Sequence, residues 1–239
     1  MKHLSVLLQG EFKRLIRYKL LQVGFLVSVL WLLVMFLIGR DNANEFVPLF
    51  IFMDVALMTI MLIGASLFYE RQENTLKSML TSPASMFKII TAKIISAVYI
   101  GLQSTLFLGL IAYFFFEAEI NFFYLIPFSI LISLFHTMIG YTFTVFVKDF
   151  PSLLALTMSY MLIFAFPSIF YAIGMLEGAI EYILLLSPSH ASMLMINYSF
   201  NGDIEGWMII VGIVYLMVAT FVLARFIVFP RYIDKAVKD

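Results

Sequence analysis

The stretch KLLQVGFLVSVLWLLVMFLIGR, residues 19–40, decides the fold of this chain. No charged side chain occurs between Lys19 and Arg40, and the residues between them are almost all apolar. About 20 such residues in a helix are long enough to cross the hydrocarbon core of a bilayer. The run is too long for a buried strand and shows no strict alternation, so we predict a transmembrane helix over 20–39.

Five further runs have the same character and predict five more transmembrane helices. They are Phe46–Tyr69, Ile94–Phe116, Phe122–Val147, Ser152–Met175 and Trp207–Val228. Only 13% of the 239 residues are charged and 63% are hydrophobic, whereas soluble domains have about 25% charged residues. We therefore expect one all-α, polytopic membrane domain over 1–239. The absence of cysteine excludes disulfides and thiol chemistry.

The basic residues predict the orientation of the chain. If the N-terminus lies in the cytoplasm, every Lys and Arg except Arg40 falls on the cytoplasmic side, and the outer loops are acidic. The positive-inside rule favours this arrangement. We expect a multi-pass protein of the cell membrane with both termini in the cytoplasm.

The leader, residues 1–19, has the pattern of an amphipathic helix. Apolar side chains recur at helical spacing, at Leu4, Leu8, Phe12 and Leu15. Basic side chains fall toward another face, at Lys13, Arg14 and Arg17. We predict a helix on the inner membrane surface; the alternative is a charge cluster that only sets the topology.

The outer segment 176–206 is too apolar for an ordinary loop and too short to cross the membrane. Ser187-Pro188 is a typical helix start, with Ser as the cap and Pro at the first helical position. We predict two short helices, before and after this point, that re-enter the outer leaflet. Protein or water would have to cover such pieces.

The segment YERQENTLKSMLTSPASMFKIITAK, residues 69–93, interrupts the apolar sequence between the second and third spans. Leu76, Met79 and Leu80 form one apolar stripe if the segment is helical. Ser82-Pro83 would end this helix and begin another. Such a ridge suits a groove on a partner protein; the alternative is a helix lying flat on lipid headgroups.

This loop, 70–93, resembles the signature loop of the type-two ABC exporter permeases. The residues that match are Glu70, Arg71, Thr75, Leu76, Leu80, Pro83 and Lys93. The resemblance extends over the whole chain and implies that the loop is a coupling helix that docks on an ABC ATPase subunit. It assigns coupling to Glu70, Arg71, Thr75, Leu76, Met79 and Leu80, with Glu70 paired to Arg14 or Arg17; the alternative for Glu70 and Arg71 is an ordinary charged helix terminus.

The resemblance also implies the partners. The chain has no Gly-x-x-x-x-Gly-Lys-Ser/Thr motif, so we expect no cofactor on this chain, with ATP and Mg on the partner subunit. Two ATPase sites require a second permease copy, as a homodimer or a heterodimer. Lipid bilayer is the other expected partner, and no nucleic acid partner, catalytic residue or metal site is expected.

Candidate residues of the substrate path lie in the second and fifth spans. Asp54 is the one acid within a predicted span, and Met58 and Met61 follow on its face. An intramembrane carboxylate is functional by default; the alternative is a hydrogen bond to a neighbouring helix that only fixes packing. Phe164 and Phe170 lie in the fifth span, which lines the path in the resembled family, or they are ordinary lipid-facing or core aromatics.

Three further patterns bear on specificity and packing. The order of Asp54, Gly64, Glu70 and Arg71 resembles that of the fluoroquinolone or multidrug export permeases. Small residues recur every fourth position in the third span, at Ala97, Gly101, Thr105 and Gly109, and predict close helix packing. His136 is isolated within the fourth span and does not predict a metal site.

The resemblance therefore implies the transmembrane subunit of an ATP-driven exporter for a hydrophobic or amphipathic substrate, including drugs, that works by alternating access. Two alternatives of other classes stay open. One is a secondary transporter or channel, which inverted repeats would favour. The other is an intramembrane enzyme, which would need clustered His and acidic residues within the spans.

Overall fold

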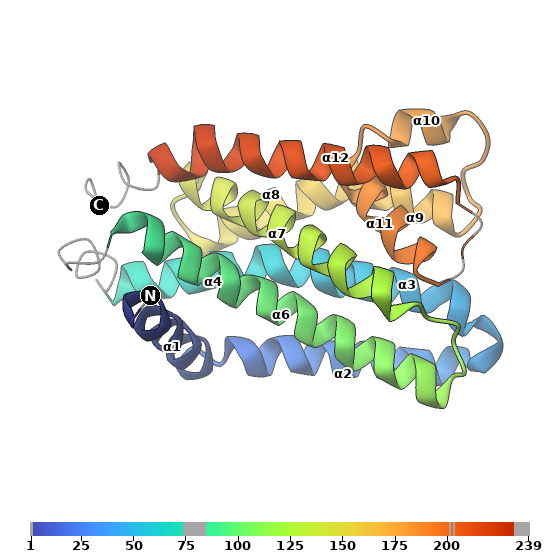
Figure 1. The fold of residues 1–239 in the computed structure, drawn as a ribbon, viewed down its shortest axis with the longest axis horizontal. Helices are drawn as coiled ribbons and strands as arrows, with labels where there is room; N and C mark the ends of the chain where they lie inside the picture. The colour runs from blue at the N-terminus through green and yellow to red at the C-terminus, as the bar shows by residue number, and fades with distance from the viewer. Residues whose placement is uncertain (1, 74–84, 201, 203, 232–239) are drawn as a thin grey trace.

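The computed structural model describes residues 2–73, 85–200, 202 and 204–231. Its long helices run side by side along one axis (Figure 1). Within the described ranges, six helical stretches are long and apolar enough to cross a membrane, and no strand occurs there. The prediction of an all-α polytopic membrane protein is confirmed.

Three spans are single helices and three contain a π-helical turn. The single helices are α2 (Leu20–Ile38), α6 (Met86–Phe115) and α7 (Phe122–Phe146). The second span comprises α3 (Ala43–Met53), η2 (Asp54–Met58) and α4 (Thr59–Gln72). The fifth comprises α8 (Phe150–Tyr160), η3 (Met161–Ala165) and α9 (Phe166–Ala172), and the sixth comprises α12 (Gly206–Leu223) and η4 (Ala224–Val228).

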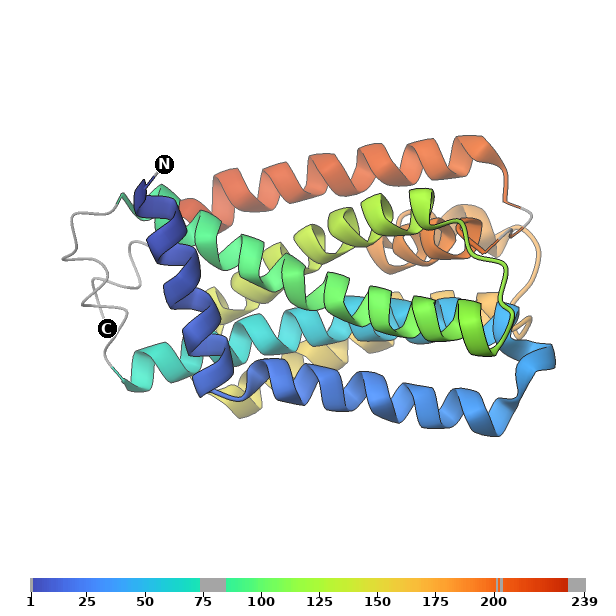
Figure 2. The same ribbon diagram turned by 60° about the horizontal axis from the view of Figure 1, so that its bottom comes forward.

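The leader forms α1 (Lys2–Arg17), which lies across one end of the bundle (Figure 2). The chain turns sharply into α2 at Lys19, whose φ of 58° is in the left-handed region. Leu15 is buried, and the ring of Phe12 meets that of Tyr99 on α6 at 5.0 Å between centroids. The predicted helix is present, and its apolar face packs on the transmembrane helices.

The segment between the fifth and sixth spans forms α10 (Ile180–Leu184) and α11 (Pro188–Tyr198). Ser187 caps α11, because its Oγ accepts a hydrogen bond from the backbone N–H of His190, and Pro188 is the first helical residue. The predicted helix start is therefore confirmed. The structure contains no membrane, so re-entry into a leaflet stays a prediction.

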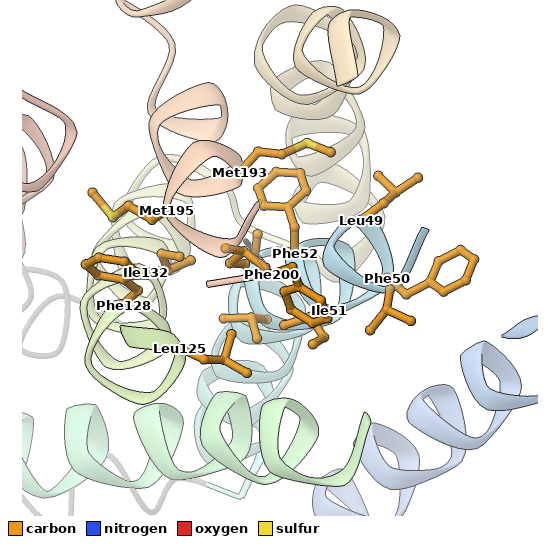
Figure 3. Close-up of a cluster of buried hydrophobic side chains, with 14 of the residues drawn as sticks. Leu49, Phe50, Ile51, Phe52, Leu125, Phe128, Ile132, Met193, Met195 and Phe200 are labelled. Carbon is orange, nitrogen blue, oxygen red and sulfur yellow. The ribbon is translucent and has the colours of Figure 1, made fainter. Parts of the chain in front are cut away.

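Helix α11 is inserted into the main hydrophobic core. Every residue of α11 from Pro188 to Ile196 is buried. Met193 and Met195 lie among side chains of α3 and α7, including Phe52 and Phe128 (Figure 3). This explains why the segment between α10 and α12 is so apolar, because it completes the core between the spans.

The small residues of α6 allow a close approach to α7 within one chain. A Cβ placed on Gly101 would lie 2.1 Å from Oγ of Ser133. Gly109 faces Phe122 and Leu125 in the same way, with the nearest atoms at 3.3 and 3.4 Å. The predicted packing role of this stripe is confirmed, and its partner is α7.

Candidate functional site

A cluster of four charged side chains joins three helices at the end of the bundle where α1 lies. Glu11 and Arg14 come from α1, Glu70 from α4 and Lys93 from α6. Lys93 Nζ contacts the carboxylate of Glu70 and lies 3.2 Å from Oε1 of Glu11. Arg14 contacts Glu11 and places its Nε 3.5 Å from Oε1 of Glu70. Two acids and two bases make the cluster formally neutral.

The charges of this cluster must balance because three of its four side chains are buried. Glu11, Glu70 and Lys93 are at most 2% exposed. Removing a charge from water costs several kcal/mol, and the cost is recovered only when a partner is held in good geometry. Separating the three helices at this end would expose or unpair these charges. The cluster therefore fixes α1 against both α4 and α6.

Further contacts join the C-terminal end of α1 to the C-terminal end of α4. The carboxylate of Glu73 lies 3.2 Å from Arg17 and accepts a hydrogen bond of 2.8 Å from the hydroxyl of Tyr18. The Tyr18 ring stacks on that of Tyr69 with centroids 5.0 Å apart. The end of α1 and the residues just after it thus contact α4 up to residue 73.

The structure partly matches the ion pairs expected from the sequence. Glu70 pairs with Arg14, one of the two predicted partners, whereas Arg17 pairs with Glu73. Glu11 and the pairing of Lys93 were not anticipated. The available signals were an acid in an otherwise basic leader and a lysine at the head of an apolar span.

Arg71 faces a different helix from its neighbour Glu70. Its guanidinium donates a hydrogen bond of 3.2 Å to the backbone carbonyl of Thr144 on α7 and lies 5.3 Å from the ring centroid of Phe68. The two adjacent charges of the motif therefore connect α4 to α1 and α6 on one side and to α7 on the other.

The other predicted coupling residues lie outside the described residues. These are Thr75, Leu76, Met79 and Leu80, all within 74–84. The described residues resume at Ser85, just before α6. Helix α6 contributes Lys93 to the buried cluster. The helix predicted for 74–81 and its docking role stay predictions, while the charged cluster joins α4 and α6, the helices on either side of residues 74–84.

Asp54 is enclosed where the second span meets α2 and α6. It is 1% exposed, and Oγ of Ser28 on α2 donates a hydrogen bond to its Oδ2. Oγ of Ser104 on α6 lies 3.2 Å from Oγ of Ser28. Oδ1 of Asp54 has no hydrogen-bond partner among the described residues. The hydrogen bond that the packing alternative requires is therefore present.

The other predicted path residues are separated into two groups. Met58 packs against the cluster that contains Leu15 and Leu62, close to α1 and α2. Met61 is half-buried on α4. Phe164 is half-buried in η3, and Phe170 is 40% exposed on α9, stacked on Phe166 with centroids 6.0 Å apart. The structure does not bring Phe164 or Phe170 into contact with Asp54.

His136 belongs to a directed chain of hydrogen bonds in the core. Ser189 on α11 donates to the hydroxyl of Tyr160 on α8 at 3.1 Å, and this hydroxyl lies 3.2 Å from Nε2 of His136 on α7. Nδ1 of His136 lies 2.8 Å from the carbonyl of Ile132. Since a carbonyl only accepts, Nδ1 carries the proton and Nε2 accepts from Tyr160. No sequence pattern predicted that hydrogen bonds would join α7, α8 and α11.

No metal centre is found in the part of the chain that the structure describes. In that part, no three His, Asp or Glu side chains lie close enough together to hold a metal ion.

The family comparison matches residues 2–201 to the ABC-2 type transporter family. The match covers most of the chain, so this protein belongs to the ABC-2 type transporter family. The comparison with curated proteins finds no match. Membership defines the chain as the transmembrane component of an ABC transporter.

Proposed function

We propose that this chain is the permease subunit of an ATP-driven exporter and that ATP hydrolysis on a partner moves its helices through residues 74–84. The single observation that carries the proposal, given the family, is the buried cluster of Glu11, Arg14, Glu70 and Lys93. It joins the helices that lead into and out of this segment to one another and to α1.

The cluster supplies a mechanical connection. A force on 74–84 reaches the ends of α4 and α6, and because Lys93 contacts Glu70 these ends move together. Glu11 and Arg14 transmit the same displacement to α1. The continuous spans that begin or end at these points then carry it toward the middle of the bundle, as alternating access requires.

The proposed assembly contains two permease chains and two ATPase subunits, because one chain supplies one coupling segment. The second permease copy is either identical or a sister chain. Both termini and residues 74–84 lie in the cytoplasm of a cell-membrane protein, as the distribution of Lys and Arg favours. ATP and Mg are held by the partner.

The proposed substrate is hydrophobic or amphipathic, in keeping with the resemblance to multidrug export permeases. Its path lies along the second and fifth spans, past Asp54, Met58 and Met61 on one and Phe164 and Phe170 on the other. Asp54 is enclosed by Ser28 and Ser104 in this conformation. A cationic substrate would therefore meet its carboxylate only after α2 or α6 moves away.

The test is ATP-dependent transport by the purified complex in vesicles. The chain is co-expressed with its cognate ATPase subunit, and a panel of cationic and neutral amphipathic dyes is assayed. We expect ATP-dependent transport and substrate-stimulated ATP hydrolysis, both lost when the phosphate-binding lysine of the ATPase is replaced. Transport by the permease alone, driven only by an ion gradient, would contradict the proposal.

A further inference from the structure

Two apolar grooves meet on the outer surface of the bundle, beside α12. The larger, of about 490 Å³, lies between α7 and α12 and is lined by residues including Leu131, Leu134 and Met217. The second, of about 290 Å³, is lined by Phe87, Phe229 and Arg225. Phe221 and Ala224 line both grooves, so the two form one continuous depression.

Arg225 is the one charged residue in the lining of these grooves. It is exposed, and its guanidinium lies 5.8 Å from the ring centroid of Phe226. No carboxylate in the described ranges lies within ion-pair distance of it. A guanidinium on the lipid-facing surface, with no carboxylate of the described ranges beside it, is free to take a lipid phosphate as its counter-ion.

The depth of Arg225 matches the edge of the hydrocarbon layer. Helix α12 begins at Gly206, and at 1.5 Å per residue Arg225 lies about 29 Å further along. The hydrocarbon core is about 30 Å thick. Arg225 therefore lies at the headgroup level. Figure 1 shows that the C-terminal end of α12 and helix α1 are on the same side of the bundle.

The wall that α12 contributes to the groove is about as long as one leaflet, and the wall that α7 contributes runs from Pro127 to Leu134. Met217, in the far part of the lining, lies eight residues from Arg225, which is about 12 Å along the helix. Half of the hydrocarbon core is about 15 Å. An open apolar groove that ends in a cation is complementary in polarity and charge to a phospholipid with an anionic headgroup.

We propose that this groove is a binding site for an anionic phospholipid of the leaflet on the α1 side. The phosphate lies on Arg225, because a guanidinium pairs with phosphate through two parallel hydrogen bonds, and an acyl chain lies between α7 and α12. Basic pockets between transmembrane helices are known to select such headgroups. The site is on the third, fourth and sixth spans, apart from the proposed substrate path, and requires only that the chain spans a bilayer.

The test places a reporter in the groove. Phe221→Trp is reconstituted alone in phosphatidylcholine nanodiscs that contain one-tenth brominated phosphatidylglycerol or one-tenth brominated phosphatidylcholine. The parent chain, which has two tryptophans, gives the background. We expect at least twofold stronger quenching of the added tryptophan by the anionic lipid. Equal quenching by both lipids would overturn the proposal.

Two further variants identify the contacts. Adding Arg225→Gln should make quenching by the two lipids equal, whereas Arg40→Gln, which removes a cation at the other end of the bundle, should preserve the difference. Ala224→Phe fills the point where the grooves join and should weaken quenching by the anionic lipid. Arg225 is exposed, so its variant should keep the parent melting temperature. A preference that survives Arg225→Gln would contradict the assigned phosphate contact.

Discussion

The ammonium group of Lys93 contacts the carboxylate of Glu70, and these residues lie on the helices that flank residues 74–84. Both side chains are at most 1% exposed. This buried pair holds α4 to α6, the helices on either side of the segment.

Lys93→Met should strongly destabilise the protein. It leaves Glu11 and Glu70 with Arg14 alone, so one buried negative charge has no counterpart. Breaking a buried pair in this way costs about 3–5 kcal/mol. We expect a lower melting temperature of the purified chain in detergent, measured by scanning fluorimetry.

A charge-balanced variant provides the control for Lys93→Met. Adding Glu70→Gln removes one charge of each sign and leaves the pair of Glu11 and Arg14, so most of the lost stability should return. Arg40→Met breaks an exposed pair with Glu117 of 2.8 Å and should change the stability by no more than about 1 kcal/mol. If the double variant is no more stable than Lys93→Met, charge balance does not explain the cluster.

Asp54→Asn should reduce transport of cationic substrates about tenfold, because loss of about 1.4 kcal/mol of binding free energy gives that factor. Neutral substrates should be transported as before, since the amide keeps the size and accepts the hydrogen bond from Ser28. Transport assays with paired cationic and neutral dyes measure this difference.

Ser28→Ala is the matched control for Asp54→Asn. It removes the hydrogen bond but keeps the carboxylate, so it should lower the melting temperature without changing the ratio of cationic to neutral transport. Equal loss of both substrates in Asp54→Asn would mean that Asp54 serves packing alone.

His190 should make the protein less stable in mild acid. Burial lowers the pKa of His190 from its usual 6.5 to about 4, and neither ring nitrogen has a partner among the described residues. Below pH 6.5 the unfolded chain takes up a proton that the folded chain refuses until about pH 4. Stability therefore falls as the pH falls through this window, by about 2 kcal/mol at pH 5.

His190→Leu should remove this part of the pH dependence. The ring of His190 is buried against Tyr171, with centroids 5.5 Å apart, so an apolar side chain suits the site. The melting temperatures of the parent chain and the variant are compared at pH 7.5 and pH 5. A parent chain that loses no more stability than the variant would show that His190 is not the responsible group.

Much of the fold could be predicted because lipid imposes simple rules. Apolar runs identified the six spans, and Ser187-Pro188 identified the start of α11. The π-helical turn at Asp54 and the contact of Ser28 with Asp54 could not be predicted, because both depend on how helices rotate against one another. The pairing of Lys93 with Glu11 joins residues 82 positions apart, and no local pattern encodes such a contact.

The central claim is that residues 74–84 bind the ATPase subunit, and affinity co-purification tests it most directly. Leu76→Asp with Leu80→Asp places two charges on the predicted apolar stripe. Asn74→Asp with Ser78→Asp adds the same charges to the other face of the predicted helix and is the matched control. We predict that the first variant loses the ATPase while the control retains it; equal retention of the ATPase by both variants would contradict the claim.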